Sequence, residues 1–215
     1  MMGPTIGPIA GRVIGIFGIC LSLAAAGCVD LAPGTKEPAR LFTLSPKSTF
    51  SKQLPTTGWH LNVEMPSAGS VLSSPKIALR KSAFAHDYYA RATWVDRAPT
   101  MVRTLLVESF SNTRKIVSVT GQPLAPRADY ALVTELREFQ AEYDGDGPPA
   151  VRVRINAKLV RLPRRTIVAT KSAEYVERAK GTNLEQIITA FDEALGRVMR
   201  RIVEWTLTAL PKPKK

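Results

Sequence analysis

The clearest feature of this sequence is a pair of long segments in which apolar and polar residues alternate, at residues 130–143 and 151–159. A period of two places successive side chains on opposite faces of a strand, so both segments are expected to be half-buried in a sheet. A turn at Pro163 and Arg164 follows, and residues 165–176 are interpreted as a third long strand that returns along the second. In the first segment the apolar positions change phase near Arg137 and Glu138, which predicts a β-bulge. Turn residues separate the segments, and an antiparallel meander is therefore predicted.

Shorter strands are predicted before this meander. They lie at residues 41–44, 59–65, 75–80 and 115–119, and a loop rich in Ser, Thr and Pro separates the first two. Residues 81–95 are less regular and are rich in aromatic side chains, among them Tyr88, Tyr89 and Trp94. These residues are not assigned to a helix or a strand.

Two other segments repeat their apolar positions every 3.6 residues, as amphipathic helices do. The first covers residues 97–112, with Asp96 as the expected N-cap and Pro99 in the first turn. The second begins at Thr182, where Glu185 three residues later completes a capping box. The predicted fold class is α+β, an antiparallel β-meander packed on one face by two α-helices.

The first 27 residues are predicted to be a signal for export. Arg12 is the only charge before the end of an apolar run of 12 residues, Val13 to Ala24, and small residues follow this run. A membrane-spanning helix is the alternative. However, 12 residues of helix cover only ~18 Å of the ~30 Å hydrocarbon core.

The position of a cysteine after this run suggests lipid attachment. The segment from Leu23 to Cys28 resembles a bacterial lipobox, in which a lipid is joined to the Cys thiol before cleavage. We expect cleavage before Cys28 and lipidation there, with an ordinary secretory cut nearby as the alternative. Cys20 is removed with the signal, so the mature chain has no disulfide. By resemblance to sorted lipoproteins, Val29, directly after the lipidated residue, favours the outer membrane, whereas Asp30 weakens that preference.

This processing divides the chain into four parts. They are the signal peptide at residues 1–27, the lipidated Cys and a tether at 28–40, an α+β domain at 41–210 and a basic tail at 211–215. Several acyl chains on one residue would hold the domain stably at the membrane. The predicted localisation is the outer membrane, lipid-anchored and facing the periplasm.

The chain is strongly basic, with a formal net charge of +12 and a pI near 10.0. Removal of Arg12 with the signal leaves +11 on the mature chain. Such a charge usually favours nucleic acid, but export removes that partner and leaves an anionic lipid surface or an acidic protein. A solvated surface with no bound partner is the alternative.

The sequence shows no signature of an enzyme, so no catalytic residue is predicted. The mature chain holds only His60 and His86, which are far apart, and neither a metal nor a cofactor site is expected. The segment Asp144 to Gly147 lacks the spaced acids of a calcium loop and is interpreted as a hairpin turn.

Three carboxylates on one predicted strand have a structural interpretation. They are Glu135, Glu138 and Glu142. Paired carboxylates can act in acid–base catalysis, but Arg137 and Arg152 offer ion-pair partners nearby. We therefore expect these acids to stabilise the sheet.

Two groups of residues are candidates for binding. The first is aromatic: Tyr88, Tyr89 and Trp94 either dock a partner or pack beneath the sheet. The second is the cationic face of one strand, formed by Arg152, Arg154 and Lys158, with Arg161, Arg164 and Arg165 around the turn that follows. That face either contacts anionic lipid or an acidic partner through its side-chain cations, or it is simply a solvated face of the sheet.

Particular segments carry a resemblance to a known family. One is Pro75-Lys76-Ile77-Ala78-Leu79-Arg80, followed by Tyr88-Tyr89 and by Trp94-Val95-Asp96-Arg97-Ala98-Pro99. Another runs from Tyr130-Ala131-Leu132 to Glu135-Leu136-Arg137-Glu138-Phe139. With the lipobox, these segments resemble the ABC-type transport auxiliary lipoprotein family over roughly residues 39–207.

This resemblance implies a function that composition and spacing alone do not indicate. Members of the family, including the paraquat-inducible membrane protein C group, accompany lipid-transport systems of the mammalian-cell-entry (MCE) type. The implied role is a non-catalytic lipoprotein in a system that moves phospholipids or other hydrophobic molecules between inner and outer membranes. Its partners would be an MCE-domain protein with its permease and ATPase, and outer-membrane lipid, with a homo-oligomer left open. An assembly factor for a secretin or a lipopolysaccharide-transport machine is the alternative function.

Overall fold

The computed structural model describes residue 3, residues 38–122 and residues 128–209. The predicted signal peptide, Cys28, most of the tether and the basic tail lie outside these residues. The described residues from Pro38 onwards form one compact unit, and all the described helices and strands lie in it. Among the described residues, no helix is both long and apolar enough to span a membrane.

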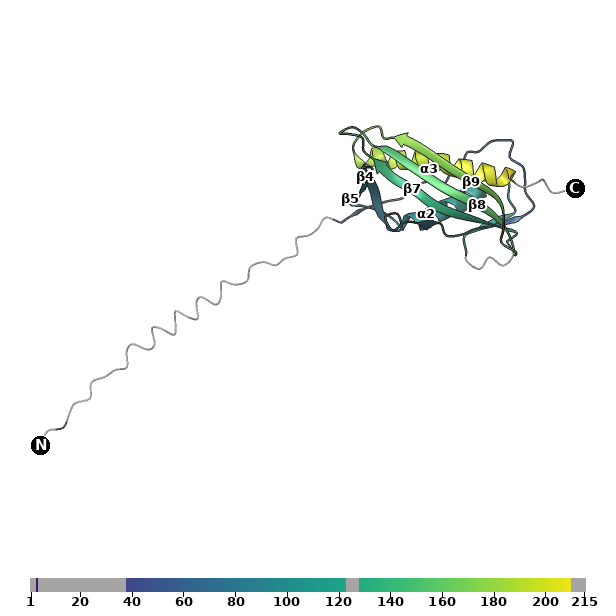
Figure 1. Cartoon of the computed structure of the whole chain (residues 1–215), viewed down its shortest axis with the longest axis horizontal. Helices are drawn as coiled ribbons and strands as arrows, with labels where there is room; N and C mark the ends of the chain where they lie inside the picture. The colour runs from purple at the N-terminus through teal and green to yellow at the C-terminus, as the bar shows by residue number, and fades with distance from the viewer. Residues whose placement is uncertain (1–2, 4–37, 123–127, 210–215) are drawn as a thin grey trace. The chain divides into compact units, whose positions relative to one another are not determined.

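Three long antiparallel strands form the main part of the sheet, as the sequence predicts (Figure 1). They are β7 (Tyr130–Glu142), β8 (Ala150–Arg161) and β9 (Thr166–Arg178). In β8 the side chains of Val151, Val153 and Ile155 are fully buried. The pairing of β7 with β8 shifts register between Leu136 and Glu138, which confirms the predicted bulge.

The sheet as a whole is mixed, which corrects the prediction of a purely antiparallel meander. Three strands run parallel to β7: β2 (His60–Val63), β3 (Ser67–Ala68) and β4 (Lys76–Ser82). A further strand, β6 (Ser118–Thr120), lies parallel to β2. Between β4 and β6 the chain passes through a helix. A long crossover of this kind lets strands that come before it pair in parallel with strands that come after it. Side chains alternate in both kinds of pairing, so the sequence pattern could not distinguish them.

The aromatic segment at residues 81–95 belongs to a hairpin of two strands. β5 (Ala85–Trp94) pairs antiparallel with β4, and β1 (Arg40–Phe42) pairs with β5 in parallel. The register of this hairpin shifts twice, and Arg91 has a positive φ of 53°. These irregularities break the period of two, which explains why the sequence pattern did not predict a strand here.

Two helices pack on one face of the sheet and share its hydrophobic core (Figure 1). They are α2 (Ala98–Thr113), which packs against β2, β6 and the second helix, and α3 (Leu184–Thr208), which packs against β8 and β9. The predicted inner face of the first helix is confirmed, because its members are all buried: Met101, Val102, Leu105, Leu106, Ser109 and Phe110.

Both N-caps lie one residue later than predicted. In α2 the N-cap is Arg97, and the Asp96 carboxylate accepts a hydrogen bond from the Arg97 amide at 2.6 Å instead of capping the helix. In α3 the side chain of Asn183, rather than Thr182, accepts a hydrogen bond from the Gln186 amide at 2.9 Å. Cap positions depend on local φ and ψ angles, which the spacing of side chains does not determine.

An aromatic cluster joins the sheet to the helical layer. Trp94 of β5, Phe139 of β7 and Phe191 of α3 have ring centroids 5.2 to 5.6 Å apart. All three side chains are fully or almost fully buried. Large aromatic side chains bury much apolar area and add favourable ring–ring contacts, so the cluster holds β5 and α3 against β7.

Candidate interaction surface

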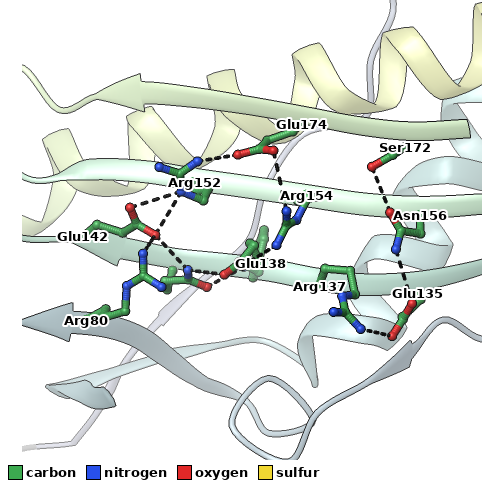
Figure 2. A network of polar contacts seen from close by, with 12 residues as sticks. Arg80, Glu135, Arg137, Glu138, Glu142, Arg152, Arg154, Asn156, Ser172 and Glu174 are labelled. Atoms are coloured by element: carbon green, nitrogen blue, oxygen red, sulfur yellow. Dashed lines mark hydrogen bonds and ion pairs between the residues drawn. The ribbon is translucent and has the colours of Figure 1, made fainter. Parts of the chain in front are cut away.

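The face of β7, β8 and β9 that points away from the helices is lined by polar and charged side chains (Figure 2). From β8 it receives Arg152, Arg154, Asn156 and Lys158. These residues alternate with the buried positions of the strand, and a period of two therefore directs them away from the core. We refer to this surface as the outer face.

Glu142, at the end of β7, joins three other side chains of the outer face (Figure 2). Its carboxylate accepts hydrogen bonds from Arg152 Nε at 3.1 Å and from Arg80 Nη2 at 2.5 Å. Gln140 donates to Glu142 at 3.0 Å and to Glu138 at 2.6 Å, so it bridges the two carboxylates. The Glu142 side chain is only 16% exposed. Removing it would leave two arginines without this partner.

Arg152 and Arg154 of β8 are both paired with carboxylates. Arg152 donates to Glu174 of β9 as well as to Glu142, and Arg154 donates to Glu138 at 2.7 Å. Arg154 Nη1 also lies 3.9 Å from a carboxylate oxygen of Glu174. With the arginine from β4, three arginines face three glutamates, and this network is electrically balanced. A lipid phosphate would have to displace a carboxylate to bind these β8 arginines.

The β-bulge supplies a second group of polar contacts. Arg137 is the extra residue of the bulge and donates to Glu135 at 2.8 Å. This hydrogen bond lowers the pKa of Glu135 below its ordinary value. Asn156 donates to Glu135 at 3.4 Å and accepts a hydrogen bond from Ser172 at 2.9 Å. The ion-pair partners that the sequence suggests for the β7 carboxylates are therefore in place.

The β8–β9 turn lies at one end of the sheet, which we call the far end. Positive charges without ion-pair partners lie at this end. Within the described part of the chain, Lys158, Arg161 and Arg164 are exposed and have no carboxylate within salt-bridge distance. Arg161 lies over the Tyr130 ring, 5.9 Å from its centroid, and Trp59 packs edge-on against the same ring. The surplus charge of the outer face is thus here, not at the paired arginines of β8.

The predicted aromatic docking surface is divided between the core and the surface. Trp94 is 1% exposed and packs in the core, which favours the packing alternative for this residue. Tyr88 and Tyr89 are half-buried, and their hydroxyls bond to the Val71 carbonyl at 3.3 Å and to the Tyr143 hydroxyl at 2.9 Å. Burial, together with the hydrogen bond, raises the pKa of Tyr89. Only the two tyrosines retain surface for a partner.

The described residues hold no group of three or more His, Cys, Asp or Glu side chains that could bind a metal ion. His60 Nδ1 lies 2.7 Å from Ser118 Oγ, in a contact between neighbouring strands. A groove of about 540 Å³ lies between the end of β9 and α3. Charges of both signs line it: Glu177, Arg178, Lys180, Glu193 and Arg197.

Two members of the ion-pair network were not identified from the sequence. Glu174 faces Arg154 across the β8–β9 pair, and Arg80 faces Glu142 across the β4–β7 pair. A register assignment for the β8–β9 hairpin would have found Glu174. The parallel contact of β4 with β7 has no local signal. The sequence also did not single out Phe84, which is 98% exposed in the turn between β4 and β5.

A mixed sheet with one helical layer defines the class of the protein as an α+β domain. Residues 42–203 match the family model described as the ABC-type transport auxiliary lipoprotein component. The chain belongs to this family, which confirms the resemblance found in its sequence. Membership identifies it as a membrane-anchored lipoprotein associated with ABC-type transport.

Similar proteins agree with this assignment at the level of the fold. The crystal structure of protein XCC0632 from Xanthomonas campestris has 29% sequence identity and a TM-score of 0.75, over 80% of this chain and 96% of that one. An uncharacterized protein of known structure has 16% identity and a TM-score of 0.61, over 78% of this chain and 97% of that one, and it shows the fold alone. The uncharacterized protein bll6063 of Bradyrhizobium diazoefficiens is 27% identical over 126 residues, which are 57% of this chain. This chain spans about a third of the length of that relative, with 32% covered.

Proposed function

We propose that this protein is a non-catalytic lipoprotein component of an ABC transport system of the MCE type, which moves phospholipids or other hydrophobic molecules between inner and outer membranes. The observation that carries the proposal is the family match over residues 42–203, preceded by a lipobox that ends at Cys28. In this proposal Cys28 is acylated and holds the domain at the outer membrane, facing the periplasm. The transporting subunits are separate chains.

The role of the domain in such a system is to bind a partner. The exposed cations of the far end, Lys158, Arg161 and Arg164, suit an acidic surface of an MCE-domain protein. Arg152 and Arg154 keep the strands of this surface in register through their glutamate partners. These pairings favour a structural role for the two arginines and a contact role for Lys158.

The partly exposed tyrosines of β5 offer a second contact area. The Lys76 ammonium lies over the Tyr88 ring, 5.0 Å from the ring centroid. Tyr rings provide rigid contact area with a polar tip, and such residues are common at the centres of protein interfaces. We propose Tyr88 and Tyr89 as a site where the partner packs beside the sheet.

The proposal is tested by recovering the intact lipoprotein from detergent-solubilised envelope and identifying the co-purified proteins and lipids by mass spectrometry. We expect an MCE-domain protein with its permease and ATPase. A Cys28→Ala variant serves as the control, because it lacks the acylated thiol and should be lost from the membrane fraction. Recovery of a secretin or a lipopolysaccharide-transport machine would contradict the proposal and support an assembly role.

A further inference from the structure

The turn between β4 and β5 presents an aromatic ring to solvent. Phe84 is 98% exposed, and it lies between Ala83 and Ala85, which are also exposed. The nearest charge along β4, on Lys81, is paired with Asp87 at 3.0 Å. Single exposed apolar residues are common on protein surfaces, so exposure alone carries no conclusion. The position of this turn relative to the point where the chain enters the domain is more informative.

The chain enters the domain from the side on which this turn lies. β1 runs parallel to β5, with Arg40 beside Ala92, and β5 runs away from the turn. A chain that continues β1 backwards therefore leads toward the turn. Arg40 also pairs with Glu185 in the first turn of α3, which places the same end of the helix nearby. The amide of Tyr143 donates to the Arg80 carbonyl, so the β7–β8 turn belongs to this end too. We call it the tether end.

The length of the tether limits which end of the domain can meet the membrane. Ten residue steps separate Cys28 from Pro38, a maximal reach of ~35 Å. The seven residue steps of strand from Ala92 to Ala85 extend ~23 Å, within that reach. The 25 residues of α3 extend ~38 Å from its first turn toward the far end. A chain anchored at Cys28 can therefore bring the tether end to the membrane, but its tether is too short for the far end.

We propose that the β4–β5 turn inserts the Phe84 ring into the interfacial region of the membrane that holds the lipid anchor. This inference rests on the proposed lipidation of Cys28. The tether keeps the turn at a high effective concentration near the bilayer, so one aromatic side chain suffices to orient a domain that is already anchored. Asp144 and Asp146 lie in the neighbouring β7–β8 turn and oppose attraction by anionic lipid. The contact is therefore apolar and requires no anionic headgroup.

Insertion sets the orientation of the whole domain. With the tether end on the bilayer, the far end points into the periplasm. The exposed cations at the far end, Lys158, Arg161 and Arg164, then face away from the anchoring membrane. This arrangement presents them to a soluble or inner-membrane partner, as the proposed docking role requires.

The test places an environment-sensitive fluorophore at each end of the intact, acylated protein. Acylation consumes the Cys28 thiol, so Ala83→Cys and Arg164→Cys each add a single reactive thiol. Both labelled proteins are reconstituted in phosphatidylethanolamine vesicles with a minor fraction of phosphatidylglycerol and a nitroxide-labelled lipid. We expect a blue-shifted emission and several-fold stronger quenching at residue 83 than at residue 164. Adding Phe84→Ser to the Ala83→Cys protein should abolish both effects while the urea midpoint stays the same.

Flotation of the same vesicles separates the inference from the proposed function. Protein that floats with the vesicles but shows equal quenching at both ends would overturn insertion and leave the anchoring intact. Protein that does not float would overturn the anchoring and, with it, the insertion. A label at residue 83 that stays solvent-exposed on vesicles and becomes shielded only on adding the solubilised MCE-domain protein would assign the turn to a protein contact instead.

Discussion

At the scale of single residues, the same type of side chain serves different purposes according to where the fold places it. Trp94 and Phe84 are both aromatic and lie ten positions apart, yet one is 1% and the other 98% exposed. Arg152 faces two carboxylates, whereas Lys158 on the same face of the same strand has no ion-pair partner among the described residues. Residue type alone does not decide which of them binds.

The burial of Trp94 predicts a large effect on stability. Trp94→Ala removes a ring that contacts Phe139 and Phe191, and we expect the free energy of unfolding to fall by about 3–5 kcal/mol. Urea denaturation followed by circular dichroism measures this loss. Phe84→Ala is the matched control, and it should change stability by less than about 0.5 kcal/mol because its ring is solvated. Similar losses for the two variants would contradict the assigned core.

The hydroxyl of Tyr89 predicts a loss of stability at alkaline pH. Burial and the Tyr143 hydrogen bond raise its pKa above the ordinary value of 10.0. The folded protein therefore keeps this proton at a pH at which the unfolded chain loses it. The Tyr89 hydroxyl makes its full contribution to the free energy of unfolding below about pH 10, and this contribution falls as the pH rises above that value. Urea midpoints measured between neutral and alkaline pH should fall less steeply for Tyr89→Phe than for the natural protein. Equal slopes would show that the hydroxyl ionises freely in the folded state.

At the scale of elements, helix starts and strand registers carry testable detail. α3 begins at a side-chain cap that Asn183 provides, one residue after the Thr182 expected from the capping-box pattern. Both residues are good N-cap types, and only the backbone conformation decides between them. In β7 the apolar positions change from one face of the strand to the other because of a single extra residue.

Because Asn183 caps α3, alanine substitutions at Asn183 and at Thr182 are expected to change stability by different amounts. Asn183→Ala removes the acceptor for the Gln186 amide and should lower the free energy of unfolding by about 1 kcal/mol. Thr182→Ala removes no cap hydrogen bond and should have little effect. Chemical denaturation of the two variants side by side distinguishes these positions. A larger loss of unfolding free energy for Thr182→Ala would contradict this assignment and support the capping box that the sequence suggests.

The bulge predicts an unusual tolerance to deletion. Without Arg137, Leu136, Glu138 and Phe139 alternate regularly and keep their β8 partners, so we expect a folded protein that loses less than about 2 kcal/mol. Deletion of Val133, in a regular stretch of the same strand, should instead turn Leu136 outward or shift the pairing, and prevent stable folding. Circular dichroism and thermal unfolding report both outcomes. Equal damage from the two deletions would show that the bulge itself is required.

At the scale of the whole molecule, charge and tether length divide the domain into two ends. The paired arginines and glutamates of the outer face cancel, and the exposed cations gather at the far end. The chain enters near the start of α3, where Arg40 meets Glu185. The proposed lipid anchor on a short tether at one end and the exposed cations at the other suit a protein that links a membrane to a partner.

This division predicts that charge reversal affects partner binding at one end only. Lys158→Glu places a negative charge at the far end and should reduce recovery of the co-purified partner severalfold, more so at low salt. Lys180→Glu makes the same charge change near the tether end and should leave recovery unchanged. Quantitative mass spectrometry of the two pull-downs compares them. Equal recovery would remove the far end as the docking surface.

Much of the fold could be predicted from the sequence because local periodicity records burial. The alternation in β7 and β8, the phase change at Arg137 and the inner faces of the two helices all reflect contacts between each segment and one core. Such patterns are properties of neighbouring residues, so they are legible without knowledge of the rest of the chain. The family resemblance depends on the same local segments.

Tertiary structure alone decided the features that depend on how distant segments meet. Arg80 and Glu142 are 62 residues apart, and only the parallel pairing of β4 with β7 brings them together. Contacts with Phe139 and Phe191 bury Trp94 in the core, whereas Phe84 is exposed at the β4–β5 turn. Register between segments far apart in sequence is fixed by the packing of the whole core, and no local pattern encodes it. By itself the sequence determined which residues are buried in β7, β8 and the two helices; the assembled sheet decided which charges remain free to bind.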